Sequence, residues 1–252
     1  MSNLTFHDLL TLIEDRSAAL RVAAAEVALD SLVPGCPDWS VRDLVAHLGE
    51  VQRTWAYIVA AGPSAEPPDE DAVPGVEPAE DLLAWSAEST GELVRALAAA
   101  GPDRECWTWW AQAGGSAPST SGAVARHQVQ EAAVHAFDAQ EAAGHGEPLP
   151  AAVAADGVPE FLTVSLASLG PWPHEPGQVG LDAAGAGTWV VDLDADGAAT
   201  RPPGAAGQPG AWLRGPASDL VLALYGRNAH GEVEIEGDSE LAEQLLEWPD
   251  NE

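Results

Sequence analysis

Four side chains that can bind metals or move protons follow one another at helical spacing around the segment QVQEAAVHAFDAQ. His127, Glu131, His135 and Asp138 recur every three or four residues, which places them along one face of a helix. The ordinary interpretation of such a stripe is a polar face in contact with water, and an acidic chain makes that the default. The alternative is that Glu131 and His135 are two ligands of a metal site, which needs a third ligand from elsewhere in the chain.

His47 is a candidate for the third ligand. It lies in SVRDLVAHLGEV, where Leu44, Leu48 and Val51 recur at the spacing of an apolar helix face. A single histidine on such a face is more often a hydrogen-bonded core residue than a ligand. Helical bundles nevertheless build metal sites from inward-pointing side chains of facing helices. Two histidines, one carboxylate and an open position are typical of a catalytic zinc site, and the same set also suits nickel or ferrous iron.

Helices are predicted over most of the first 170 residues. Apolar residues recur at helical spacing from Thr5 to Leu29, and the proline-containing segment LVPGCPDW interrupts the pattern. Ser40 is then a candidate N-cap, with Asp43 three residues later as a variant capping box. Further helices are expected at residues 41–61 and 79–99, in the segment that carries the polar stripe, and at residues 151–169.

The composition changes after a proline-rich linker, GPWPHEPG. Beyond it, apolar and polar residues alternate in QVGLDA, TWVVDLDA, AWLRG and EVEIEG, as in half-buried strands, and two helical segments lie among them. The sequence therefore predicts a chain of class α plus α+β, with a helical domain at residues 1–170 and a small α+β domain at residues 176–252.

The charge of the chain excludes some classes of partner. Its 252 residues carry 40 acidic and 10 basic side chains, for a formal net charge of −30. Such a chain repels nucleic acids and anionic membrane surfaces, so neither is expected as a partner. No segment approaches the roughly 20 apolar residues of a membrane span, and the N-terminal segment does not have the pattern of a signal peptide. Two cysteines make no disulfide framework, and we expect a reduced, cytoplasmic protein.

Three segments resemble the signatures of one known family, in the same order. LVPGCPDWSVRDLVAHLGEV resembles CPGWTVxDLxAHLG, and RHQVQEAAVHAFDAQEAAG followed by PLPAAVAADGVPEFL resembles ExxVHRxDAE…P…LAADGIDEFL. LRGPASDLVLALYGR resembles VxGPAADLLLxLxGR. These signatures belong to the mycothiol-dependent maleylpyruvate isomerase family, a branch of the DinB-like superfamily. The resemblance covers nearly the whole chain and is weakest at residues 62–120.

The resemblance implies a fold and a chemistry. The fold is an N-terminal DinB-like four-helix bundle followed by a small sterol-carrier-like α/β domain. The family's divalent metal, usually zinc, maps onto His47, Glu131 and His135. Its cosubstrate is mycothiol, a small thiol whose metal-held thiolate attacks an electrophilic substrate. In isomerases the thiolate adds to maleylpyruvate and leaves after bond rotation, whereas in S-transferases the adduct is the product. We expect a monomer or a homodimer.

Further residues match the family with less defined roles. Arg227 matches the final GR and suits a substrate carboxylate, with a surface ion pair or a position at a helix end as the alternative. Asp138 matches the family aspartate, where it would orient His135 or cap the helix. Cys36 is either a rival nucleophile or a buried cysteine. His127 lies outside the matched ligand pattern and is a candidate pocket residue.

Two departures from the signatures keep the substrate open. Asp38 stands where the family prefers glycine, and Ala136 stands where it prefers arginine, so an anion contact at that position cannot be assumed. Cys106 lies among tryptophans that either line a pocket or pack in a core. The residues do not decide between isomerase and S-transferase. Two other functions stay as alternatives: a non-catalytic metal- or small-ligand-binding protein, and a metal-sensing regulator, which would have no basic DNA-reading element.

Overall fold

The computed structural model describes residues 4–64, 66–204, 208–227 and 233–249, and the chain divides into two compact units. The helical unit extends to Trp109 and includes Pro118–Glu147, whereas the sheet unit includes Trp110–Ala117 and the chain from Pro148 onward. The domain limits at residues 170 and 176 stay predictions. The compact units divide the chain near residue 148 and group the predicted fifth helix with the sheet.

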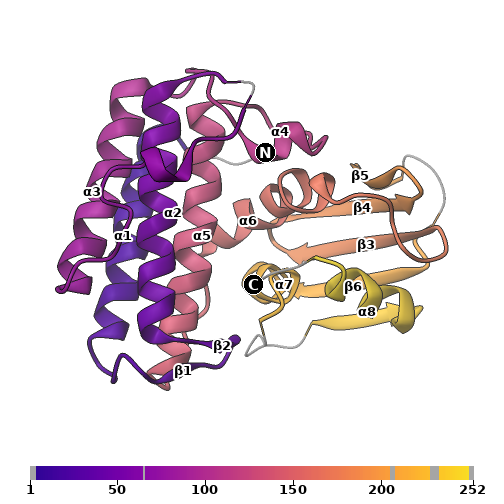
Figure 1. Ribbon diagram of the computed structural model, residues 1–252. Helices are drawn as coiled ribbons and strands as arrows, with labels where there is room; N and C mark the ends of the chain where they lie inside the picture. Colours follow the sequence, from indigo (N-terminus) through magenta and orange to yellow (C-terminus); the bar gives the residue numbers. More distant parts are fainter. Residues whose placement is uncertain (1–3, 65, 205–207, 228–232, 250–252) are drawn as a thin grey trace. The chain divides into compact units, whose positions relative to one another are not determined.

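Four long helices form the helical unit. Within it, α1 packs against α5 and α2 packs against α3 (Figure 1). The elements up to α5 are α1 (Phe6–Ala24), β1 (Leu32–Val33), β2 (Cys36–Ser40), α2 (Val41–Ala61), the 3-10 helix η1 (Glu70–Ala72), α3 (Leu82–Ala100), the short α4 (Trp109–Gln112) where the chain passes between the units, and α5 (Ser121–Ala142).

The ends of α2 are fixed by local sequence. Ser40 and Asp43 form the predicted capping box, in which each side chain accepts a hydrogen bond from the backbone N–H of the other. Such a cap contributes about 1 kcal/mol. The helix ends at Gly62, whose φ of 87° is accessible to glycine at little cost. These two ends set the helix that carries His47.

A glycine in the middle of α2 lets α3 approach closely. A Cβ atom on Gly49 would lie 2.1 Å from Cζ3 of Trp85, so the indole occupies the space that any larger residue would need. The indole is held from two further sides: its Nε1 donates a hydrogen bond to the Gly75 carbonyl over 3.0 Å, and the guanidinium of Arg53 lies over its ring. The turn of α2 that carries His47 is therefore packed against a rigid partner.

The segment LVPGCPDW, predicted as an interruption between helices, forms an antiparallel hairpin of β1 and β2. The first helix was predicted to reach Leu29, but it ends at Ala24. The carbonyls of Leu29 and Ser31 accept hydrogen bonds from the first N–H groups of α2. The segment after α1 therefore caps the N-terminal end of α2. The hairpin brings Cys36 and Trp39 beside the N-terminal end of α2.

The sheet unit contains a mixed five-stranded sheet of order β5-β4-β3-β6-β7, in which β3 and β6 are parallel and the other pairs are antiparallel. Helices α7 and α8 contact β3 and β6 (Figure 1). Its elements are α6 (Ala151–Thr163), η2 (Leu166–Ser168), β3 (Gly177–Ala184), β4 (Gly187–Asp194), β5 (Gly197–Arg201), β6 (Ala211–Pro216), α7 (Ala217–Leu224), β7 (Glu234–Gly237) and α8 (Ser239–Glu247).

The predicted fold class is confirmed: a helical N-terminal part precedes a mixed α/β part. Alternation of apolar and polar residues predicts β3, β4, β6 and β7, but not β5, because GAATR has no large apolar side chain to mark a buried face. The predicted helix at 151–169 is shorter, since α6 ends at Thr163 and the 3-10 helix η2 follows. Among the described residues, no helix has the length and apolar character needed to span a membrane.

Candidate metal centre and adjoining pocket

The polar stripe of α5 is buried inside the helical unit. His127, His135 and Asp138 are 8%, 7% and 0% exposed, and the Glu131 side chain is 17% exposed. The interpretation of this stripe as a face in contact with water is therefore wrong. Burying several ionisable groups on one helix costs free energy unless they are paired or bind an ion, so their arrangement needs a specific explanation.

His47 from α2 meets Glu131 and His135 from α5. Oε1 of Glu131 lies 3.1 Å from Nε2 of His47 and 3.3 Å from Nε2 of His135. One ligand atom from each residue lies within 4.8 Å of the other two. Ligands bound tetrahedrally to zinc at ordinary bond lengths lie about 3.3 Å apart. The two separations that involve Glu131 are close to this spacing. Two nitrogens with one carboxylate are also a donor set that such ions accept.

A second contact fixes the ring of His135. Its Nδ1 lies 3.0 Å from Oδ2 of the fully buried Asp138. A neutral His135 therefore carries its proton on Nδ1 and presents the lone pair of Nε2 toward Glu131. The thiol of Cys36 donates a long hydrogen bond, 3.9 Å, to the same carboxylate oxygen. Cys36 is 4% exposed, which agrees with its interpretation as a buried cysteine.

The cluster concentrates negative charge around imidazoles. Burial raises the pKa of the Glu131 carboxyl, but hydrogen bonds with His135 and His47 outweigh burial and hold that pKa well below its usual range. Burial lowers the pKa of His135, but hydrogen bonds with Asp138 and Glu131 outweigh it and raise that pKa to about 9. The site thus favours a positive charge between its side chains, and in the metal-free protein a proton supplies it.

Trp39 of the hairpin covers the cluster. Its ring centre lies 4.7 Å from that of His47 and 6.0 Å from that of His135. Trp39 has no role predicted from the sequence, although it belongs to the CPDW segment of the first signature. The hairpin therefore explains why that signature continues into the helix that carries His47.

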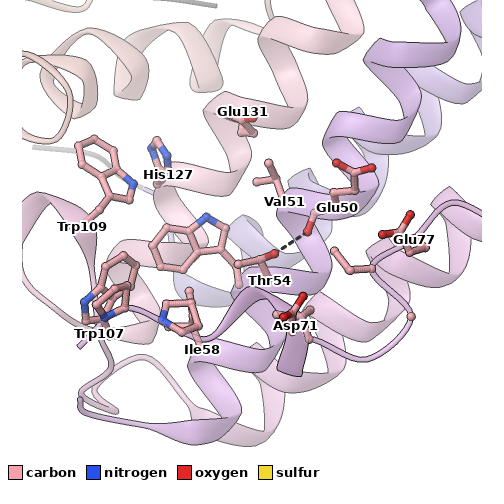
Figure 2. Close-up of a pocket in the computed structure, with 16 residues that line it drawn as sticks. Glu50, Val51, Thr54, Ile58, Asp71, Glu77, Trp107, Trp109, His127 and Glu131 are labelled. Atoms are coloured by element: carbon pink, nitrogen blue, oxygen red, sulfur yellow. Dashed lines mark hydrogen bonds between the residues drawn. The ribbon is translucent and has the colours of Figure 1, made fainter. Parts of the chain in front are cut away.

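A pocket of about 880 Å³ adjoins the cluster and shares Glu131 with it (Figure 2). Its lining comes from α2, from the connection between α2 and α3, from the start of α4 and the segment before it, and from α5. The lining residues are Glu50, Val51, Thr54, Trp55, Ile58, Pro67, Pro68, Asp71, Val73, Gly75, Val76, Glu77, Trp107, Trp109, His127 and Glu131. Sequence reasoning missed Glu50, Asp71 and Glu77 among them, since these lie outside the matched signatures or in the region of weakest resemblance.

Of the other residues singled out in the sequence, His127 lines the pocket, whereas Cys106 and Trp110 are buried. His127 lines the pocket, with its ring centre 6.4 Å from Trp55 and 5.9 Å from Trp109, as expected for a pocket candidate. Cys106 is 3% exposed and burial raises the pKa of its thiol to about 11, so it holds its proton. Of the tryptophans around it, Trp110 is fully buried and belongs to the sheet unit.

Arg227 also lies in the sheet unit. It is 5% exposed, and its Nη1 donates a 2.6 Å hydrogen bond to the carbonyl of Tyr225. The guanidinium is therefore not on the surface, as the ion-pair alternative required. Arg227 follows the end of α7 at Leu224, and its backbone N–H donates to the Leu222 carbonyl, which agrees with the helix-end alternative. Its role toward the substrate stays a prediction.

Comparisons with known proteins decide the family. The family model described as the mycothiol maleylpyruvate isomerase N-terminal domain matches residues 10–140, and the model of the family's C-terminal domain matches residues 152–244. The chain belongs to the mycothiol maleylpyruvate isomerase family. His47, Glu131 and His135 all lie within the part that matches the N-terminal domain model.

Solved structures of similar fold carry the same family name. A crystal structure of the mycothiol-dependent maleylpyruvate isomerase has a TM-score of 0.59 to this chain, and a structure of its histidine-to-alanine mutant has a TM-score of 0.63. Both are 16% identical in sequence, and each comparison covers 94% of this chain and 95% of the other. At this identity the likeness supports the fold. No curated protein matches the chain.

Proposed function

We propose that this member of the mycothiol maleylpyruvate isomerase family is a mycothiol-using enzyme of isomerase type that depends on a divalent metal. The observation that carries the proposal is the convergence of His47, Glu131 and His135 from two helices, with one ligand atom of each within 4.8 Å of the others. Zinc is the first choice, and nickel or ferrous iron also suits two imidazoles and a carboxylate.

The three residues would hold the metal beside the pocket, whose lining includes Glu131. When bound, the ion would supply the positive charge that favours the thiolate form of a thiol over the neutral form. The protein's own groups prepare the site in advance. Asp138 keeps the Nε2 lone pair of His135 directed inward, and the negative Glu131 attracts a cation between the two histidines.

Mycothiol would supply the sulfur nucleophile for a thiol-catalysed cis–trans isomerisation. In this reaction class the sulfur adds to a conjugated double bond, the bond rotates, and expulsion of the sulfur restores the double bond. The pocket beside Glu131 has room for a small substrate, and part of its lining is apolar, with Ile58, Trp107 and Trp109 among those residues. His127, buried in the pocket lining, is an ionisable side chain that would exchange a proton with the adduct.

The first experiment measures metal content per chain by elemental analysis, on protein purified without a metal-binding tag. We expect about one zinc ion per wild-type chain, and loss of that zinc in His47→Ala and in His135→Ala. His145→Ala is the matched control, because His145 is exposed and pairs with Glu26 on the surface. A wild-type protein that is metal-free and takes up no added zinc would overturn the proposal and favour the non-catalytic binding protein.

The second experiment separates the isomerase from the S-transferase. Mycothiol and a cis conjugated electrophile are incubated with the zinc-loaded protein, and thiol and product are both followed. An isomerase regenerates the thiol and accumulates the trans compound, whereas an S-transferase consumes one thiol per product. We expect regeneration, and stoichiometric loss of thiol would contradict the isomerase assignment.

A further inference from the structure

The pocket has two chemically unlike walls. Figure 2 shows Glu50, Asp71 and Glu77 on one side, and Trp107 and Trp109 on the other. Glu131, the residue shared with the metal cluster, lies on α5 where the two walls meet. Whatever reacts beside that cluster is therefore flanked by carboxylates on one side and by indole rings on the other.

The acidic wall, as far as the structure describes it, includes no basic side chain. Asp71 and Glu77 are exposed and Glu50 is half-buried. Among the described lining residues there is no arginine, and the chain has no lysine. Arg53, on the same helix as Glu50, lies beside the pocket-lining Gly75, but its guanidinium already donates hydrogen bonds to Ser89 and Glu92 of α3. At the acidic wall an anion would meet the negative charges of Glu50, Asp71 and Glu77, in addition to those of a chain of net charge −30. The proposed metal would attract an anion only at the Glu131 end of the pocket.

The surroundings of Glu50 already disfavour its negative charge. Burial raises the pKa of its carboxyl, with Glu77 acting in the same direction and His47 in the opposite one. A second negative charge near Glu50 is thus already unfavourable in the empty pocket, and a bound anion would add to it. A ligand cation or hydrogen-bond donor would relieve it.

The tryptophan wall suits a flat ligand. The ring centres of Trp55 and Trp107 lie 6.4 Å apart, and Trp109 packs beside the pocket-lining His127. Indole faces attract flat conjugated groups through stacking and attract cations through their negative faces. They offer no charge to hold a carboxylate.

We propose that the electrophile of this enzyme is a flat conjugated molecule that is neutral or positively charged, and that the pocket excludes dicarboxylates. Its assignment as an electrophile rests on the proposed function, whereas the charge preference rests on the pocket alone. Maleylpyruvate carries two carboxylates, so it belongs to the excluded class. The chain therefore shares the family's fold but acts on a substrate of different charge.

The activity test compares two electrophiles with the same cis double bond. Zinc-loaded protein and mycothiol are given dimethyl maleate, which is neutral, or maleate, which is a dianion, and conversion to the trans isomer is followed. Each rate is divided by the rate with mycothiol alone, which removes the difference in intrinsic reactivity. We expect the acceleration of the ester to exceed that of maleate by about tenfold or more. Repulsion between maleate and a few weakly screened carboxylates is large enough to produce such a difference. Equal acceleration of maleate would overturn the proposal.

Charge-neutralising variants locate the effect. The triple variant Glu50→Gln, Asp71→Asn, Glu77→Gln should bring the two accelerations close together. The matched control is Glu14→Gln, Asp15→Asn, Asp30→Asn, which removes three exposed acids that do not line the pocket. This control should keep the wild-type preference, and a control that abolishes it would attribute the preference to net charge and overturn the proposal.

A binding test is independent of catalysis. Calorimetric titration of thiol-free protein with 1-naphthylmethylammonium and with 1-naphthoate compares a cation and an anion on the same flat ring. We expect the cation to bind about tenfold tighter, and equal or tighter binding of naphthoate would overturn the charge preference. If the cation binds tighter but no electrophile is isomerised, the proposed function fails while the charge preference of the pocket stands.

Discussion

The same short contact occurs in two parts of this molecule with different surroundings. In α5, Nδ1 of His135 lies 3.0 Å from Oδ2 of Asp138, and on the sheet Nε of Arg214 lies 3.0 Å from Oε2 of Glu236. The side chains of the first pair are 9% and 0% exposed, whereas those of the second are 33% and 51% exposed. Contact distance alone therefore does not distinguish a functional pair from an ordinary one.

Burial makes the difference. An exposed pair is solvated before and after it forms, so it contributes at most about 1 kcal/mol. A buried pair has lost its water, and removing one partner leaves the other in an unfavourable state. The sheet uses Arg214, Asp182 and Glu236 as a cross-strand surface cluster, while the helical unit encloses its charged groups beside a pocket. The same kind of substitution should therefore have a large effect in the buried cluster and a small effect in the exposed cluster.

The largest contrast is expected from removing one carboxylate charge in each region. Glu131→Gln takes away the negative ligand between His47 and His135, so we expect zinc binding to be abolished in elemental analysis. Glu236→Gln removes the partner of Arg214 and should leave metal content unchanged. Retention of stoichiometric zinc by Glu131→Gln would contradict the proposed ligand set.

Asp138→Asn should give the next largest effect. The amide keeps the size of the side chain but loses the charge that orients His135, so zinc affinity should fall by about 10–100-fold. Competition with a chromophoric chelator measures the change. Asp182→Asn, which removes a carboxylate from the exposed cluster on the sheet, is the control and should keep wild-type affinity.

The pH dependence of the metal-free protein sharpens the comparison further. The pKa of His135 is raised from 6.5 to about 9, so the protonated ring stabilises the fold below pH 6.5 and this contribution is lost as the pH rises to about 9. Zinc displaces the same proton, and its affinity should therefore rise over the same interval. Urea unfolding of the metal-free protein and chelator competition measure the two opposite slopes. A zinc affinity that is flat across the interval would contradict the position of His135 as a ligand.

The smallest effect is expected from Arg214→Ala. Because Arg214 and both of its acidic partners are partly or largely exposed, the free energy of unfolding should fall by no more than about 1 kcal/mol. Chemical denaturation at moderate salt measures this change. A loss several times larger would show that the exposed cluster is as important to stability as a buried one.

The sequence predicted which residues form the metal cluster, but it did not predict that they are buried. Helical spacing aligned Glu131 with His135, and the family signatures added His47. Spacing could not show that the stripe is buried, because α5 presents small alanines on several sides and the burial comes from the helices packed around it. The capping box at Ser40 was predictable because all its contacts are local.

The acidic wall and the hairpin depend on tertiary contacts. Asp71 and Glu77 lie in an irregular, proline-rich connection, where no periodicity indicates which side chains face a pocket. Trp39 approaches the histidines only because a short hairpin folds back beside α2. Strand β5 has a composition that favours no regular element and forms by pairing with β4. These features follow from the assembled unit, so reading each segment separately could not find them.

The fit of Gly49 against Trp85 has a consequence for how sequences of this family can vary. The indole fills the volume beside the glycine, so each position limits the residues acceptable at the other. A larger side chain at position 49 should be inherited together with a smaller one at position 85, and rarely without it. Gly49, the glycine of AHLG, is thus constrained by Trp85, a residue that lies outside every signature segment.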